Sequence, residues 1–263
     1  MRTMDRDPDK SSPHKRRLNC WEVMICGREQ GGVNIAEYGV CPAAADASFD
    51  GINSGKCGIA VADGLGGEVA GDYAAEILRG KLAGLNHILK NNEQPELDQL
   101  VRAIDRTIYT VGQENHALEG MGSALVGVLL RGRIAYWVHV GDSRLYLLRN
   151  GILTQVTEDQ TLARFLLEEG EITPEQLPTH YSRHVMDQCV GCGYAEPETG
   201  RLEFLAGDLL VLSTDGLHGE IPENTLNAIL NTDTNLETKA RTLVKAALDA
   251  GGKDNITVVM AQG

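Results

Sequence analysis

Four aspartates stand at the ends of apolar runs that are typical of buried β-strands. Asp63 ends the run GIAVAD, Asp142 follows IAYWVHVG, Asp215 ends LLVLSTD, and Asp254 precedes NITVVM. Carboxylates at the mouths of buried strands can converge at one end of a sheet, where their repulsion is costly unless cations neutralise it. The alternative is that each aspartate caps a helix or starts a turn. Because four of them abut strong apolar runs, we favour a shared all-oxygen site for hard ions such as Mg²⁺ or Mn²⁺.

The apolar periodicity from residue 58 onward alternates between helix and strand patterns. It predicts helices at about 68–89, 95–118, 162–169 and 223–250, the last as a pair. It predicts strands at 58–63, 123–130, 133–140, 144–149, 152–156, 201–205, 208–213 and 255–260. Asn150-Gly151 predicts a two-residue hairpin turn. Many short strands in hairpins, with helices grouped between them, indicate an α+β fold with largely antiparallel sheets.

Composition divides the chain into three parts. Residues 1–17 are polar and charged and are expected to be a disordered leader, residues 18–57 form a glycine- and cysteine-rich segment, and residues 58–263 form one domain. The formal net charge of −13 argues against a nucleic-acid partner, which would require a basic surface. No apolar stretch is long enough for a membrane span and no signal peptide is visible, so a cytoplasmic protein without a membrane partner is expected.

Six motifs in order carry a family resemblance. They are VADGLGG (61–67), GSA (122–124), VGDSRLYLLRNG (140–151), TEDQT (157–161), LSTDGL (212–217) and KDNITVV (253–259). The set resembles the bacterial branch of the metal-dependent protein phosphatases, the type 2C or PPM family, from about residue 57 to the C-terminus. The resemblance implies a sandwich of two antiparallel β-sheets flanked by helices. It also implies a hydrolase that acts on phosphoserine and phosphothreonine in proteins and is paired with a Ser/Thr kinase.

The resemblance further implies a ligand set for two or three Mg²⁺ or Mn²⁺ ions. Asp63 would bridge two ions, and the carbonyl group of Gly64 would bind one of them. Asp215 and Asp254 would hold the other, and Asp142 would hold a third, weaker ion. These implied roles make Asp63, Asp215 and Asp254 the central catalytic carboxylates.

The implied reaction is direct attack on phosphorus by a metal-bridging hydroxide, with no cysteine or serine nucleophile. Leu65 stands where relatives with a histidine are credited with a proton donor, so a metal-bound water is expected to protonate the leaving group. The stretch from about 166 to 192 resembles the mobile flap of bacterial members. His180 and Arg183 occupy the place of its HPxR pattern.

The sequence departs from the family before its first Asp-Gly motif. Asp46 stands in for the last acid of the family's short acidic motif, Ala45 replaces the preceding acid, and Cys41 falls near the position of a phosphate-binding arginine. The phosphate would then be held by the metals alone or by another arginine, Arg144 or Arg183. The alternative function is therefore a catalytically weak or inactive phosphatase-like signalling or binding module.

The cysteines form two groups. The N-terminal group resembles a bacterial module that begins Cys-Trp, and its members are Cys20, Cys26, Cys41 and Cys57. Zinc, an iron–sulfur cluster, a thiol–disulfide couple that gates the enzyme, and inert buried thiols all remain open for this group. Cys189 and Cys192 are interpreted as small apolar residues beside the flap.

Overall fold

The computed structural model of the chain describes residues 56–66, 68–83 and 96–263. The expected leader at 1–17 lies outside the described residues, and so does almost all of the cysteine-rich segment at 18–57. In the part of the chain that is described, no helix is both long and apolar enough to cross a membrane.

Two four-stranded antiparallel sheets form the centre of the molecule. The first sheet has the order β1-β2-β3-β6, with β1 at Lys56–Leu65, β2 at Gly122–Arg131, β3 at Ile134–Val140 and β6 at Glu198–Glu203. The second has the order β5-β4-β7-β8, with β4 at Arg144–Arg149, β5 at Ile152–Gln155, β7 at Leu209–Ser213 and β8 at Val258–Gln262.

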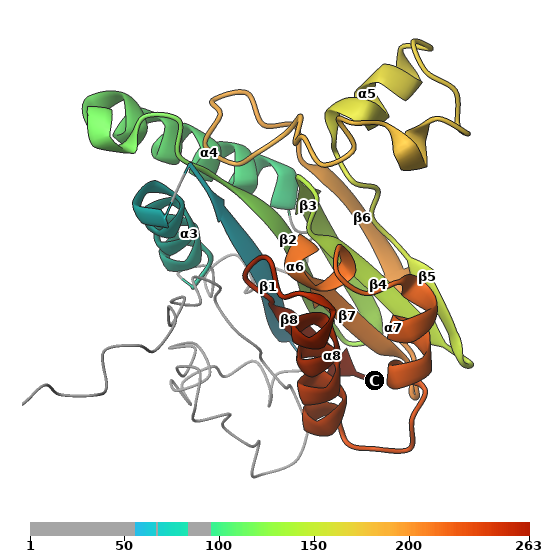
Figure 1. Cartoon of the computed structure of the whole chain (residues 1–263). Coiled ribbons are helices and arrows are strands. Elements are labelled where there is room, and N and C mark those ends of the chain that lie inside the picture. Colours follow the sequence, from blue (N-terminus) through green and yellow to red (C-terminus); the bar gives the residue numbers. More distant parts are fainter. Residues whose placement is uncertain (1–55, 67, 84–95) are drawn as a thin grey trace, which may run out of the picture.

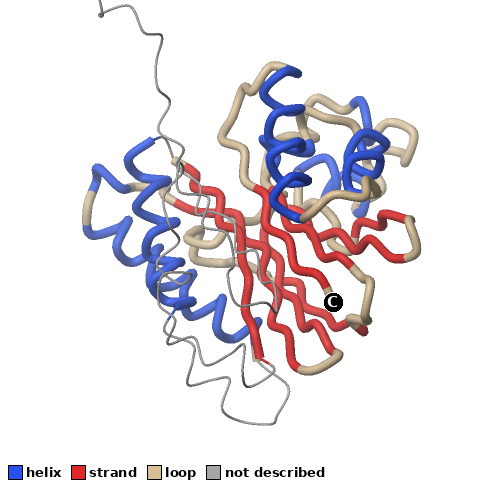
Figure 2. Tube along the Cα trace, turned by 90° about the horizontal axis from the view of Figure 1, so that it is seen from below, coloured by secondary structure: helices blue, strands red, loops and turns tan. Residues whose placement is uncertain are grey.

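Helices cover the outer faces of both sheets, which gives four layers (Figures 1 and 2). On the first sheet lie α3 (Glu68–Ala83) and α4 (Leu97–Glu114), followed by the short η2 (His116–Leu118). On the second lie α7 (Glu223–Leu230) and α8 (Leu236–Ala250). The remaining helices are α5 (Leu162–Glu168), η3 (Leu177–Thr179) and α6 (Asp215–His218).

The interface between the sheets is a dry core contributed by both. Val61 and Val126 from the first sheet pack with Leu145, Leu212 and Val259 from the second, and all five side chains are almost fully buried. Burying one such side chain contributes about 1.5–3 kcal/mol. Because interiors pack densely and resist deformation, this core fixes where the strand ends of one sheet lie relative to those of the other.

The predicted α+β sandwich is confirmed, and so is the hairpin turn. Asn150 and Gly151 have φ values of 52° and 79°, as a two-residue turn between twisted strands requires. The expected strand starts at 201 and 255 were wrong, since β6 begins at Glu198 and β8 at Val258. The earlier start of β6 follows from its pairing with β3, which apolar periodicity does not record.

Candidate metal centre

Asp63 lies within β1, near the C-terminal end of the strand but not at its last residue. It pairs with Ala124 on β2, and the strand continues through Gly64 to Leu65. Burial is the largest cause that raises the pKa of Asp63 to about 8, and the negative charges of Asp215, Asp142 and Asp254 contribute to the rise in that order. A carboxyl group with this pKa holds a proton at neutral pH, and it shares that proton in a hydrogen bond with Asp215.

Asp142 lies where the chain crosses from the first sheet to the second, between β3 and β4. The preceding Gly141 has a φ of +99°, and a Cβ atom there would lie 2.8 Å from the Cβ of Ala124. Only glycine therefore brings this turn against the β2 residue that pairs with Asp63. Burial, followed by the charges of Asp215 and Asp159, raises the pKa of Asp142 to about 7.

Asp215 and Asp254 are brought together by contacts between the loops that carry them. The Thr214 hydroxyl donates to the Asn255 carbonyl group (3.2 Å) and accepts from the Thr257 amide (3.1 Å). A Cβ on Gly216 would lie 2.0 Å from the Asn255 carbonyl oxygen, so only glycine permits this approach. Burial raises the pKa of Asp215, and the charge of Asp254 is the next largest cause. Because the Thr257 amide bonds to Thr214, β8 begins only at Val258, three residues later than the sequence predicts.

The donor set fits hard divalent cations. Burial, followed by the negative charges of neighbouring aspartates, raises the pKa of Asp63, Asp142 and Asp215, and two cations would remove the repulsion between these carboxylates. Within the described ranges, no three carboxylate, histidine or cysteine side chains already surround a single point. Mg²⁺ and Mn²⁺ tolerate this, because such ions commonly keep several waters and take only one or two carboxylates.

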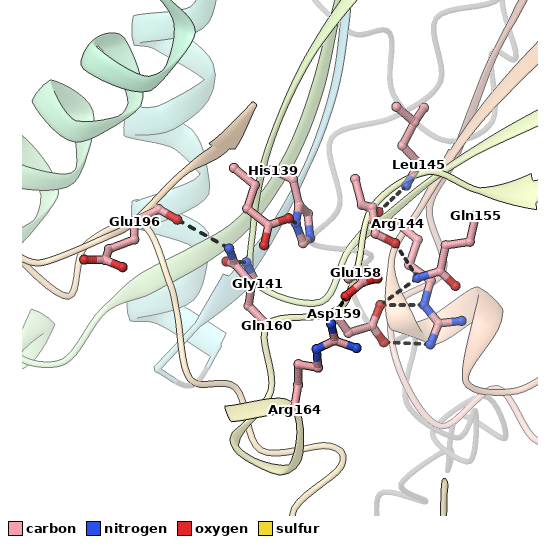
Figure 3. A network of polar contacts seen from close by, with 12 residues as sticks. His139, Gly141, Arg144, Leu145, Gln155, Glu158, Asp159, Gln160, Arg164 and Glu196 are labelled. Atoms are coloured by element: carbon pink, nitrogen blue, oxygen red, sulfur yellow. Dashed lines mark hydrogen bonds and ion pairs between the residues drawn. The ribbon is translucent and has the colours of Figure 1, made fainter. Parts of the chain in front are cut away.

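A polar network holds the turn that carries Asp142 (Figure 3). Arg144 makes a two-pronged ion pair with Asp159, at 2.7 and 2.6 Å, and donates a third bond to the Tyr146 hydroxyl at 3.1 Å. Gln155 donates to the Asp159 carboxylate at 3.2 Å. Each of the three guanidinium nitrogens of Arg144 thus donates to a protein partner, which favours a role in holding this turn.

The TEDQT motif supplies most of the remaining contacts in this network. The Gln160 side chain accepts from the Gly141 amide (2.8 Å) and donates to the Glu196 carbonyl group (3.3 Å). The Thr157 hydroxyl accepts from the Leu145 amide at 3.0 Å. The TEDQT segment therefore fixes backbone groups on both sides of Asp142. Two of the six motifs, TEDQT and VGDSRLYLLRNG, thus contact each other directly.

His218 links the loops of Asp215 and Asp142, and sequence reasoning missed it. Its Nδ1 lies 2.9 Å from the Ser213 hydroxyl, and its ring also hydrogen-bonds to the backbone of Asp142. Burial, followed by the nearby charge of Arg144, lowers the pKa of His218 to about 3. The ring is therefore neutral near pH 7 and acts as a hydrogen-bonding strut. The sequence signal was its position three residues after Asp215.

The expected flap residues lie after α5, at the end of the molecule where that helix projects (Figure 1). His180 contacts the Ser182 hydroxyl at 2.7 Å, and the exposed Arg183 donates weakly to the His180 carbonyl group at 3.4 Å. Within this segment it is His184 that interacts electrostatically with Asp215, and the sequence pattern did not single it out. Two isolated bridges, Thr161 with Met186 and Ser123 with Val190, attach the segment to the rest of the fold.

The predicted site residues therefore fall into three groups. Four aspartates come together, and Gly64 follows Asp63 on the same strand. Arg144 begins β4 shortly after Asp142, whereas His180 and Arg183 lie on the segment after η3 and make only local contacts. Some predictions fall on residues whose side chains lie outside the described part, namely Asp46, Cys20, Cys26, Cys41 and Cys57.

The chain matches a family model described as protein phosphatase 2C over residues 44–255. It is 37% identical over 218 residues to the serine/threonine protein phosphatase PstP of Mycobacterium tuberculosis, an alignment that covers 81% of this chain and 41% of that protein. The chain thus spans less than half the length of this relative. It is 34% identical to the serine/threonine phosphatase stp of Listeria monocytogenes, with 78% of this chain and 83% of the relative covered.

Among solved structures, the chain resembles the catalytic domain of PstP in complex with two manganese ions. The TM-score is 0.67 at 34% identity, with 79% of this chain and 90% of that chain covered.

Proposed function

Because the chain belongs to the protein phosphatase 2C family, we propose that it is a metal-dependent phosphatase that hydrolyses phosphoserine and phosphothreonine in proteins. The observation that carries the proposal is the burial of Asp63 beside the negative charges of three other aspartates from both sheets, which together raise its pKa to about 8. A cluster of this kind is unfavourable for a merely structural site and suits one that is completed by cations.

Asp63 and the Gly64 carbonyl group would hold one cation, and Asp63, Asp215 and Asp254 would hold a second. Asp142 would hold a third, weaker one. When bound, Mg²⁺ or Mn²⁺ supplies the positive charge that activates water and neutralises the phosphoryl oxygens. The proton on Asp63 must leave before the cations bind, so this carboxyl group couples metal binding to pH.

The surrounding residues hold this carboxylate cluster in place. The ion pair of Arg144 with Asp159 and the neutral ring of His218 orient the turn of Asp142. Arg183 and His180, on the exposed segment after α5, are the candidates to contact the substrate phosphate. His184, whose charge reaches Asp215, is a third candidate.

The expected partner is a phosphorylated protein whose phosphate was introduced by a Ser/Thr kinase. The acidic chain, with a net charge of −13, suits a protein substrate rather than a nucleic acid. We propose the cytoplasm as its location, which fits the intracellular supply of Mg²⁺ and phosphoproteins.

A metal-dependence assay tests the proposed function. The full chain is incubated with p-nitrophenyl phosphate and with phosphoserine and phosphothreonine peptides, in Mn²⁺, in Mg²⁺ and in chelator. We expect turnover in metal and none in chelator. The matched control is Asp63→Asn, which keeps the shape of the protonated side chain and removes the charge.

The same assay decides between the enzyme and a non-catalytic binding module. A module would bind phosphopeptides in a titration yet release no phosphate with either metal. Phosphate release that persists in the Asp63→Asn variant would show that the activity arises elsewhere and would refute the proposed site.

A further inference from the structure

Cys189 and Cys192 are in contact with one another. The Cys192 thiol donates to the Cys189 carbonyl group at 2.8 Å, and the two thiols form a side-chain hydrogen bond. Both are free thiols and partly exposed. They flank Val190-Gly191, so the chain carries a Cys-x-x-Cys arrangement whose two thiols interact with each other. The interpretation of these residues as small apolar side chains beside the flap does not include this contact.

The two thiols are chemically unequal. The hydrogen bond from Cys189 lowers the pKa of Cys192 to about 7, and the backbone amide of Tyr194 acts in the same direction. The contact with Cys192, together with burial, raises the pKa of Cys189. The buried carboxylate of Asp105 opposes the ionisation of both. Cys192 is thus suited to attack as a thiolate, while Cys189 stays protonated as a thiol.

The loop that carries the pair is anchored on two sides. Asp105 of α4 accepts hydrogen bonds from the amides of Gly191 at 2.7 Å and Gly193 at 3.0 Å. Val190 exchanges two backbone hydrogen bonds with Ser123 of β2, each 2.9 Å long. A loop held this firmly keeps the two thiols together and transmits their movement to β2.

The anchor on β2 lies beside the metal centre. Ser123 pairs with Gly64 across the strands, one position from the pair of Asp63 with Ala124. Gly122 lies directly beneath the loop, since a Cβ atom there would be 3.0 Å from the Cys189 sulfur. Drawing the thiols from hydrogen-bond distance to the roughly 2.05 Å of a disulfide must therefore shift the loop against β2.

We propose that Cys189 and Cys192 form a reversible disulfide pair that is oxidised by low-molecular-weight disulfides and that lowers the activity of the adjacent centre. The Cys192 thiolate attacks one sulfur of the oxidant and releases its other half as a thiolate. Cys189 then loses its proton and attacks the Cys192 sulfur, which releases the second half. Two electrons pass from the protein thiols to the oxidant, which leaves as two thiols. The effect on activity rests on the proposed function, whereas the bond itself does not.

Peptide mapping tests the bond directly. Trypsin releases residues 184–201 as one peptide that contains Cys189, Cys192 and no other cysteine. The full chain is equilibrated in glutathione buffers of rising oxidised fraction, alkylated and digested. Glutathione is preferred to peroxide because Met186 lies in the same peptide and its thioether would also oxidise. We expect an unalkylated peptide about 2 Da lighter than the dithiol form.

Two single variants identify the attacking sulfur. Cys189→Ser should accumulate a mixed disulfide at Cys192, about 305 Da heavier, while Cys192→Ser should accumulate several-fold less at Cys189. A peptide that stays doubly alkylated in oxidising buffer overturns the proposal. Mixed glutathione disulfides without the internal bond overturn it too.

The activity arm compares wild type with the double variant Cys189→Ser/Cys192→Ser, which keeps every other cysteine. Oxidation should lower the wild-type turnover roughly tenfold, since a misplacement of about 1 Å can cost a hundredfold, and a reductant should restore it. An equal loss in the double variant would refute the link between this pair and the centre. If the reduced wild type shows no phosphatase activity at all, the proposed function fails, while the mapping still decides the bond.

Discussion

The carboxyl group of Asp63 shares a proton with the carboxylate of Asp215, although one residue lies on β1 of the first sheet and the other starts α6 after β7 of the second. The two meet because the core between the sheets fixes both strand ends. In the proposed enzyme divalent cations would replace this proton, and the first two predictions follow from it.

Replacing Asp63 should remove catalysis without unfolding the protein. Asp63→Asn is expected to reduce turnover with Mn²⁺ to below about a tenth of wild type, because one carboxylate would serve two cations. Calorimetric titration should show weakened metal binding, and circular dichroism an unchanged fold. Activity retained above that level would remove Asp63 from the bridging position.

The same substitution should change how stability depends on pH in the metal-free protein. In the folded state Asp63 has a pKa of about 8 against an ordinary 3.8, so between these values the folded protein holds a proton that the unfolded chain lacks. The free energy of unfolding that this group contributes therefore falls as the pH rises above 3.8. The fall ends once the pH has passed about 8, where the folded protein also loses the proton. Asn cannot titrate, so the stability of Asp63→Asn relative to wild type should increase between pH 7 and pH 9.

The expected growth is about 1 kcal/mol, which corresponds to roughly 2–4 °C in melting temperature for a domain of this size. Thermal melts of both proteins in chelator measure it. Cys192 also titrates in this window, but it lies outside the carboxylate cluster and is common to both proteins, so its contribution cancels in the difference. A constant difference between the two melting temperatures would contradict the raised pKa.

Asp142 should contribute a weaker site than the central pair. Asp142→Ala is expected to impair turnover while leaving two tight binding events in a Mn²⁺ titration, because the carboxylates of Asp63, Asp215 and Asp254 remain. Isothermal titration calorimetry counts the sites. Loss of a tight event would instead place Asp142 among the central ligands.

The ion pair between Arg144 and Asp159 should matter for stability as well as activity. Asp159→Asn is expected to cost about 1.5–3 kcal/mol, because it leaves a largely buried guanidinium without its charged acceptor. Turnover should fall too, since this pair supports the turn of Asp142. Denaturant unfolding and a phosphatase assay measure the two effects.

The matched control is Asp249→Asn, which breaks an ion pair of Lys245 on the exposed face of α8. Such pairs contribute about 0–1 kcal/mol, so this variant should unfold close to wild type. Equal losses in the two variants would mean that the Arg144 pair behaves as an ordinary surface contact.

Apolar periodicity and six short motifs were enough to predict the sandwich, the hairpin at Asn150-Gly151 and the family. The expected strand ends at Asp63 and Asp254 were less reliable. β1 runs past Asp63 because its backbone keeps pairing with β2, and β8 starts only after Thr257 because that residue bonds to Thr214. Pairing partners decide such boundaries, and they lie far away in the sequence.

The sequence by itself determined which carboxylates lie in or beside the apolar runs that form strands, because side-chain pattern and turn residues are local properties of the chain. Only the tertiary structure decided what surrounds them. The strut at His218, the commitment of Arg144 to Asp159, the reach of His184 to Asp215 and the meeting of Cys189 with Cys192 depend on loops brought together by packing. A pKa is set by burial and by neighbouring charges in space, so no local pattern could have assigned it.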